Sequence, residues 1–288
     1  MAEQIEHRQA TESKEELLEV LQRDGVVILE GLVTPEQLQR MNQELDPFMR
    51  EAATTVPEMN PLLQMFYGDK TRRMGALPVK SRTFCDVLTH PLLAEICEEI
   101  LLKAGSSYQM NVAQVLEVGP EAVAQFLHRD EDVWPHMPKP CPTFQIASMT
   151  ALTDFTEEIG ATCFVPGSHL WEDRSREAQA DEVAIAEMPA GSMALYLGST
   201  IHGAGTNRTT DRWRRGIHLS FIVGWIRTEE NNYLNIPMEV ARDLPERVQA
   251  LLGYQMHDAI DAGGGVAGSV DFRDPMVLLR EQKSETSN

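Results

Sequence analysis

The sequence predicts an α+β fold whose second part is mainly β. Helix-start signals are concentrated before residue 105, and short β-type runs separated by turn residues follow from Tyr108 onward. Helices first and then many short strands indicate a β part built as a sandwich or a barrel. We expect one domain in the 288 residues, with a helical flank at 13–105, a β core at 106–228 and a helical segment with a flexible tail at 229–288.

Three helices carry clear start signals. The segment Ser13–Glu16 is a capping box ahead of an apolar run, and Gly25 is expected to end that helix before a strand at 26–29. The segment Thr34–Gln37 is a second capping box with proline at the first helical position. Pro91 opens the third helix, whose apolar side carries Leu92, Leu93, Ile96, Ile100 and Leu101.

The later part of the chain alternates between apolar runs and turns. The charged segment 171–182 has no periodic apolar face, so we expect a surface insertion there. The alternative is a flexible active-site lid. The glycine run 263–265 and the polar tail 281–288 are expected to be loosely ordered. The predicted strands are 112–118, 144–152, 162–165, 193–197 and 217–225.

Composition excludes several classes of protein. A net charge of −19 disfavours binding to nucleic acid, which requires a surplus of cations. The sequence has no apolar run of the length that spans a membrane, and its polar N-terminus does not resemble a secretory signal, so a cytoplasmic protein is expected. The cysteines have no CxxC spacing and are expected to be free thiols; they are Cys85, Cys97, Cys141 and Cys163.

The pair His128 and Asp130 has the most chemical content. On an extended strand, side chains two positions apart point to one face, so these two can reach the same point. The spacing alone is weak, because 8 histidines and 44 acidic residues among 288 give about 1.2 chance occurrences of His-x-Asp/Glu. A histidine from a later strand would complete the two-histidine, one-carboxylate set of non-haem Fe(II) oxygenases.

His202 is the candidate third ligand. Gly203 and Gly205 follow it, and glycine lets backbone pass close to a bound ion or ligand. A histidine in a loop without any metal is the alternative for this position.

A cationic cluster comes next along the chain. An arginine at the entry to a strand can hold a carboxylate through two parallel hydrogen bonds. The alternative is that the cluster only solvates a turn. The residues concerned are Arg212, Arg214 and Arg215.

Taken in order, these motifs resemble the phytanoyl-CoA dioxygenase family of Fe(II)/2-oxoglutarate-dependent oxygenases, and most closely its branch of fungal meroterpenoid and alkaloid dioxygenases. The resemblance covers almost the whole chain and implies a double-stranded β-helix, a jelly-roll or cupin-like barrel flanked by helices. Ile159 departs from the asparagine found in many members, at a turn and not at a ligand. The motifs are Gln125–Asp130, Ile159–Thr162, Pro166–His169 and His202–Asn207, followed by Arg214.

The resemblance implies that His128, Asp130 and His202 bind iron, with 2-oxoglutarate and O2 completing the site. Related halogenases have a small residue in place of the carboxylate, so Asp130 indicates oxygen transfer or desaturation. The expected reaction is hydroxylation of an unactivated C–H bond, or a desaturation or rearrangement. The expected substrate is a hydrophobic small molecule of secondary metabolism, such as a terpenoid, polyketide or alkaloid, and a homodimer is a family expectation.

The resemblance also implies four contacts to 2-oxoglutarate. Arg214 would hold the distal carboxylate of 2-oxoglutarate, while Gln125 and Thr162 would form hydrogen bonds to the cosubstrate. Arg73 matches a further contact seen in the meroterpenoid branch, but its neighbour Arg72 leaves that placement ambiguous by one residue.

Two alternatives of other classes remain open. One is a jelly-roll binding protein that has lost turnover, which an intact ligand set disfavours. The other is a cupin-like metalloenzyme that does not use 2-oxoglutarate, which would leave Arg214 and Gln125 without a purpose.

Several nearby residues have competing interpretations. His169 is expected to be a structural turn residue, because a further protein ligand would block O2. His218 is expected in the core or beside the site. Lining of a substrate pocket and simple packing both fit the remaining candidates, which are Trp134, His136, Met137, Phe66 and Tyr67.

Overall fold

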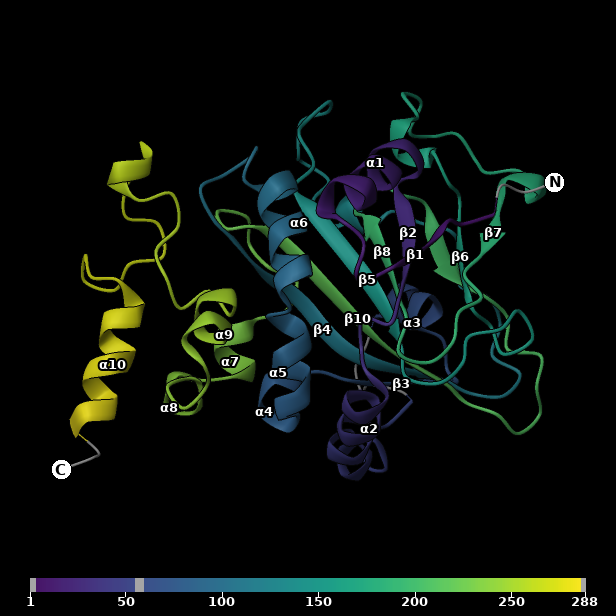
Figure 1. Cartoon of the computed structure of the whole chain (residues 1–288), viewed down its shortest axis with the longest axis horizontal. Helices are drawn as coiled ribbons and strands as arrows, with labels where there is room; N and C mark the ends of the chain where they lie inside the picture. Colours follow the sequence, from purple (N-terminus) through teal and green to yellow (C-terminus); the bar gives the residue numbers. More distant parts are fainter. Residues whose placement is uncertain (1–3, 55–59, 286–288) are drawn as a thin grey trace. The chain divides into compact units, whose positions relative to one another are not determined.

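The computed structural model describes residues 4–54 and 60–285, in which the strands form two sheets (Figure 1). The larger sheet has seven strands in the order β1-β2-β8-β5-β10-β4-β3, and the smaller has three in the order β7-β6-β9. Neither sheet closes into a barrel within the described residues. The predicted α+β class, with most strands in the second part of the chain, is confirmed.

Every predicted strand is present, with its ends displaced by four residues at most. The strands of the larger sheet are β1 His7–Gln9, β2 Val26–Glu30, β3 Thr71–Met74, β4 Tyr108–Val118, β5 Gln145–Ala151, β8 Met193–Leu197 and β10 Arg214–Val223. Those of the smaller sheet are β6 Thr162–Phe164, β7 Ala184–Ile185 and β9 His202–Ala204. Strands β1, β3, β7 and β9, which are all short, were not predicted.

The described chain divides into two compact units. The first comprises Met1–Met74, Gln114–Met137 and Ala147–His218, and the second comprises Gly75–Ala113, Pro138–Ile146 and Leu219–Asn288. The dividing points fall inside β4, β5 and β10, so each of these strands contributes residues to both units.

The core of the first unit lies between the two sheets. Strands β2, β5 and β8 each turn alternate side chains inward, and Phe164 of β6 meets them from the smaller sheet. Small residues on the larger sheet leave room for the rings of Phe155, Phe164 and Tyr196. The inward residues of the larger sheet include Val26, Ile28, Ala147, Met149, Ala151, Ala194 and Tyr196.

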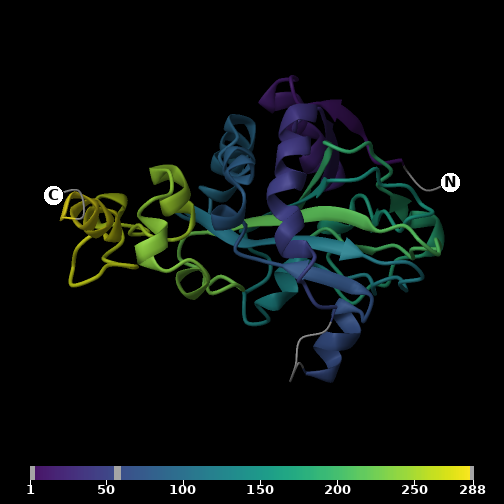
Figure 2. The ribbon, with the colours of Figure 1, turned by 90° about the horizontal axis from the view of Figure 1, so that it is seen from below.

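The predicted helices of the first unit form as their caps require. Helix α1, Lys14–Asp24, begins at the Ser13 capping box and ends at Gly25, whose φ of 76° is in the left-handed region that favours glycine. Helix α2, Pro35–Met49, begins at the Thr34 capping box. It crosses β10 in Figure 2. Arg215 of β10 donates to Asn42 and Asp46 of α2. Helix α3, Pro61–Tyr67, was not predicted.

The second unit holds the remaining helices. Among the described helices, none combines the length and apolar character that a bilayer span needs. Helix α10 continues to Glu285, so residues 281–285 of the expected loose tail are helical; 286–288 lie outside the described part. The helices are α4 Leu77–Lys80, α5 Arg82–Leu88, α6 Pro91–Leu101, α7 Asn232–Asn235, α8 Met238–Ala241, α9 Glu246–Leu251 and α10 Pro275–Glu285.

A graded truncation at Ile28 tests the core between the sheets. Ile28 is fully buried on β2, opposite Ala194 of β8. We expect Ile28→Val to lower the free energy of unfolding by about 0.5–1.5 kcal/mol and Ile28→Ala by about 2–5 kcal/mol, because a cavity replaces packed atoms. Denaturant unfolding measures both. The control Leu62→Ala, at a 71% exposed position, should change stability by less than about 0.5 kcal/mol; equal losses at both positions would contradict this placement of β2.

Candidate metal and anion site

His128 and His202 are held together by their own backbones. The N–H of each donates to the carbonyl of the other, both at 2.9 Å, so the two residues form an isolated antiparallel bridge beside β9. His202 is the first residue of β9 and therefore lies in a strand, not in a loop. The expectation of an extended strand through Asp130 is wrong, because Asp130 begins a 3-10 turn, Asp130–Val133. That turn still directs the carboxylate toward the two imidazoles.

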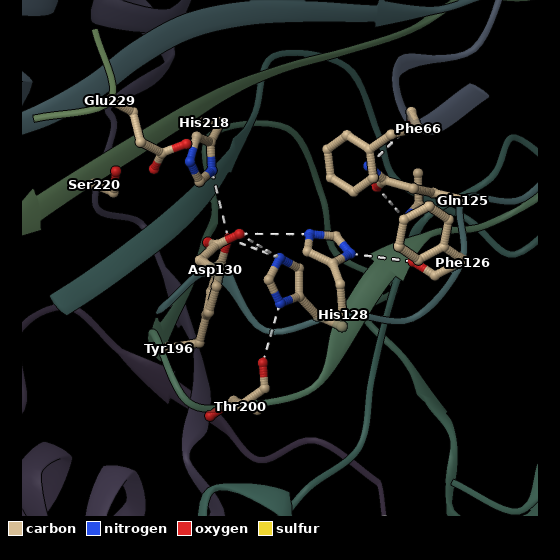
Figure 3. Close-up of polar contacts among 12 residues, drawn as sticks. Phe66, Gln125, Phe126, His128, Asp130, Tyr196, Thr200, His218, Ser220 and Glu229 are labelled. Carbon is tan, nitrogen blue, oxygen red and sulfur yellow. Dashed lines mark hydrogen bonds and ion pairs between the residues drawn. The ribbon is translucent and has the colours of Figure 1, made fainter. Parts of the chain in front are cut away.

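The three side chains converge on one point (Figure 3). Oδ1 of Asp130 lies 3.4 Å from Nε2 of His128 and 3.4 Å from Nε2 of His202. One ligand atom from each residue lies within 4.8 Å of the others. Cis ligands with bonds of about 2.1 Å stand about 3 Å apart, so the three atoms would draw closer together on binding a transition metal.

Each imidazole is oriented for ligation. Nδ1 of His128 contacts the carbonyl of Phe126 at 3.1 Å, and Nδ1 of His202 contacts the carbonyl of Thr200 at 3.1 Å. A carbonyl can only accept, so each Nδ1 carries a proton, and each imidazole in its neutral form offers the lone pair of Nε2 to the shared point. Metal-binding histidines are commonly fixed through their other nitrogen in this way.

Asp130 and His202 shift each other's pKa in opposite directions. Burial would raise the pKa of Asp130, but His202 and His128 outweigh that effect and hold the pKa well below its usual range. Burial would lower the pKa of His202, but Asp130 outweighs it and raises that pKa. The carboxylate is therefore ionised at neutral pH, as metal ligation requires.

Arg214 is a buried cation without a counter-ion. It is 1% exposed, and among the described residues it forms no ion pair. Its Nη1 donates to the carbonyl of Gly160 at 3.0 Å and to Oγ1 of Thr162 at 3.2 Å, while its Nε has no partner among the described residues. Burial lowers the pKa of Arg214 to about 10, and the positive charge of Arg73 adds to the shift. Such a group is suited to receive an anion.

The two neighbours of Arg214 in the cationic cluster serve other purposes. Arg215 points to the opposite side of β10, where it pairs with Glu117 and Asp46. Arg212 forms a surface ion pair with Glu158. The solvated-turn alternative therefore describes Arg212 but not Arg214.

The alternation of β3 separates Arg73 from Arg72. Arg72 pairs with Glu117 at 3.5 Å and stacks over Trp213. Arg73 stacks over Tyr67, has a buried Nε without a partner among the described residues, and forms no ion pair there. Burial lowers the pKa of Arg73 to about 10. Arg73 is therefore the member of the pair that shares the environment of Arg214.

Gln125 links the metal-binding segment to its surroundings. Its Oε1 accepts from the N–H of Ala204 and its Nε2 donates to the carbonyl of Phe66, both at 3.3 Å. The ring of Phe66 then packs on that of His128 with centroids 4.8 Å apart, and Phe126 lies 5.1 Å from Phe66 (Figure 3). These aromatic rings cover one side of His128.

Tyr196 was not singled out in the sequence. It is 1% exposed on β8, and its hydroxyl donates to Oδ2 of Asp130 at 3.2 Å. The same hydroxyl lies 3.3 Å from Nε2 of His202 and 3.4 Å from Nδ1 of His218. A tyrosine within an apolar strand has the pattern of a core residue, so only the pairing of β8 with its neighbours reveals this position.

The charged insertion 171–182 is anchored beside the metal-binding turn. Arg174 forms ion pairs of 2.7 Å with both Glu131 and Asp132, which directly follow Asp130. The carbonyl of Arg174 accepts from Nη1 of Arg129 at 3.2 Å. These contacts hold the first part of the insertion against the turn.

The other histidines take the places expected of them. His169 contacts the carbonyl of Gln22 through Nε2 at 3.0 Å, which is a structural role in the turn after β6. His218 lies next to the metal-binding cluster through Tyr196 (Figure 3). Trp134 and Met137 are partly buried in the turn after Asp130, and His136 there is exposed.

Comparison with known proteins finds a family match and similar dioxygenases. The family model described as phytanoyl-CoA dioxygenase (PhyH) matches residues 21–216. Dioxygenase aneA of Aspergillus aculeatus is 34% identical over 252 residues, covering 85% of this chain and 84% of that protein. Multifunctional dioxygenase prhA of Penicillium brasilianum is 36% identical over 259 residues, with coverage of 85% and 84%.

Solved structures show the same fold. The α-ketoglutarate-dependent epimerase SnoN from nogalamycin biosynthesis superposes with a TM-score of 0.57 at 22% identity, covering 73% of this chain and 80% of its own. HygX from Streptomyces hygroscopicus, solved with nickel, 2-oxoglutarate and hygromycin B, gives a TM-score of 0.57 at 16% identity, covering 75% and 89%. The predicted jelly-roll fold is thereby confirmed.

The two neighbouring arginines of β10 allow a matched test of the uncompensated charge. We expect Arg214→Met to leave the free energy of unfolding unchanged or to raise it by up to about 4 kcal/mol, because an unpaired buried cation is replaced by an apolar chain. Arg215→Met should lower it by about 3–5 kcal/mol, because Glu117 loses a partner. Denaturant unfolding of the ligand-free protein measures both, and a large loss in Arg214→Met would contradict the assignment.

Proposed function

The chain belongs to the phytanoyl-CoA dioxygenase family, and we propose that it is an Fe(II)/2-oxoglutarate-dependent dioxygenase that oxidises an apolar small molecule of secondary metabolism. The proposal rests on two features of the same unit. Arg214 is a buried cation without an ion-pair partner among the described residues, and two histidines and one carboxylate form a cluster. A metal cluster alone would not require a buried arginine that lacks a carboxylate partner.

The donor set suits Fe(II). Two neutral imidazoles and one carboxylate on one face are the ligands of non-haem Fe(II) oxygenases. Both Nε2 atoms and Oδ1 of Asp130 face the shared point, and carbonyl groups fix both imidazoles. When bound, iron with 2-oxoglutarate and O2 supplies the oxidising power for attack on a C–H bond. Asp130 occupies the position at which related halogenases need a small residue, which supports oxygenation or desaturation over halogenation.

The anion site suits the distal carboxylate of 2-oxoglutarate. Arg214 presents its free Nε and can donate parallel hydrogen bonds to a carboxylate. Thr162 adjoins Arg214 through its hydroxyl and can donate its own proton to the anion. Arg73 contributes a further buried positive charge, and Gln125 contacts the cosubstrate from the metal-binding segment. A dianion bound here would compensate both arginines.

An apolar substrate is supported by the side chains near His128. Phe66 packs on this histidine from α3, and Phe126 precedes it by two residues. Phe126 is 53% exposed, and Leu62 and Met65 of α3 are also exposed. Apolar side chains at the surface next to a candidate active site favour an apolar ligand over a charged one. The curated relatives, which are named dioxygenases, support oxidation as the reaction.

Anaerobic spectroscopy tests the cofactor proposal. Addition of Fe(II) and 2-oxoglutarate to metal-free protein should produce the weak visible charge-transfer band of the iron chelate. His128→Ala should abolish this band, because one ligand is removed, while the exposed control His136→Ala should keep it. Absence of the band in the wild type would refute the proposal. In air, an apolar substrate panel should then stimulate succinate formation, and stimulation only by charged compounds would contradict the substrate class.

A second matched pair tests the cosubstrate contacts. We expect Arg214→Ala to weaken 2-oxoglutarate binding by roughly 2–5 kcal/mol, as typical for loss of one partner of a buried charge pair. Arg73→Ala should weaken it as well, whereas Arg72→Ala should have little effect because Arg72 pairs with Glu117. Titration of the visible band with 2-oxoglutarate measures all three. A larger effect at Arg72 than at Arg73 would reverse the assignment.

A further inference from the structure

The carboxylate of Asp130 uses its two oxygens differently. Oδ1 is the atom that faces Nε2 of both His128 and His202, at 3.4 Å in each case. Oδ2 instead accepts a hydrogen bond from the hydroxyl of Tyr196 at 3.2 Å. We infer that Tyr196 is a positioning residue, which holds Asp130 as a ligand through one oxygen only. This inference rests on the proposed metal site.

The number of ligating oxygens matters for the proposed reaction. An octahedral metal has six positions, and three single-atom protein ligands leave three of them open. A chelating 2-oxoglutarate would take two of these, and one would remain for O2. A carboxylate that ligated through both oxygens would occupy that last position. A hydrogen bond that engages Oδ2 therefore protects the vacant position.

Tyr196 is built to keep its hydroxyl in place. Its ring packs between Phe164, at 5.0 Å between centroids, and His202, at 4.6 Å. The residue is 1% exposed on β8, a strand paired along its length with β2. A phenol on a fixed ring has one rotatable hydrogen, so the hydroxyl can move only by rotation about the C–O bond.

His218 restricts that last rotation. Its Nδ1 lies 3.4 Å from the hydroxyl of Tyr196, on β10 (Figure 3). With the proton on Nδ1, His218 donates to the tyrosine oxygen and leaves the phenolic proton for Oδ2 of Asp130. Nε2 of His202 would no longer accept from the hydroxyl if it bound a metal, and Oδ2 of Asp130 would remain as an acceptor.

The variant Tyr196→Phe removes the hydroxyl and keeps the ring. We expect the dissociation constant of the metal-free protein for Co(II), measured by chelator competition, to rise about 10–100-fold, the usual effect of losing a partner that orients a metal ligand. The Co(II) d–d spectrum should also change shape as Oδ2 becomes free to ligate. An unchanged affinity and spectrum would overturn the inference.

Two controls separate the possible failures. Tyr254→Phe also removes a buried hydroxyl, one that donates to the carbonyl of Ile236 at 2.8 Å, and it should leave Co(II) affinity within about twofold of the wild type. His128→Ala should lose Co(II) binding. If His128→Ala retained Co(II), the metal site itself would be refuted. If His128→Ala lost Co(II) but Tyr196→Phe bound it with full affinity, only the role of Tyr196 would be refuted.

A measurement on the unmodified protein guards against a variant that does not fold. If Tyr196 is a hydrogen-bond donor and not a ligand, the Fe(III)-loaded wild type should lack the intense visible charge-transfer band of a ferric tyrosinate. Its presence in the wild type would show that the tyrosine oxygen binds the metal, and this would overturn the inference.

Discussion

The reciprocal hydrogen bonds between His128 and His202 are the contact on which the site depends. Two residues far apart in the sequence exchange backbone N–H and carbonyl groups at 2.9 Å, which sets both imidazoles side by side. Strand β9, which begins at His202, pairs on its other edge with β6. Because Thr162 lies on β6 and contacts Arg214, the same strand pairing connects the metal-binding cluster to the anion site.

Buried charge gives the site its second property. A folded protein normally pairs an arginine with a carboxylate or exposes it to water. Arg212 and Arg215, which flank Arg214 in the sequence, both form ion pairs. Arg214 is buried and has no ion-pair partner in residues 4–54 and 60–285, so the ligand-free fold retains an electrostatic cost that an anion can relieve. Stability is thereby exchanged for affinity, which is a common compromise in binding sites.

Glycines allow the backbone segments next to β6 and β9 to approach closely. A Cβ on Gly160 would lie 2.7 Å from the carbonyl oxygen of Gly205.

Much of the fold and of the site could be predicted from local signals. The capping boxes at Ser13 and Thr34 determined two helices, since caps depend on residues close in sequence. The ligand set could be read from motif order, and the structure brings its members together. Short strands such as β3 could not be predicted, because a Thr-Arg-Arg-Met run has no apolar pattern and forms only by pairing with β4. The choice between Arg72 and Arg73 needed that register, and Tyr196 needed the neighbours of β8.

We propose that one unit of this chain holds a metal and a carboxylate anion together. The most direct measurement is anomalous diffraction at the iron absorption edge, from crystals grown anaerobically with Fe(II) and 2-oxoglutarate. We expect one iron peak bounded by Nε2 of His128, Oδ1 of Asp130 and Nε2 of His202, with a 2-oxoglutarate carboxylate on Arg214. Iron bound at other residues, or a cosubstrate whose carboxylates do not contact Arg214, would contradict the claim.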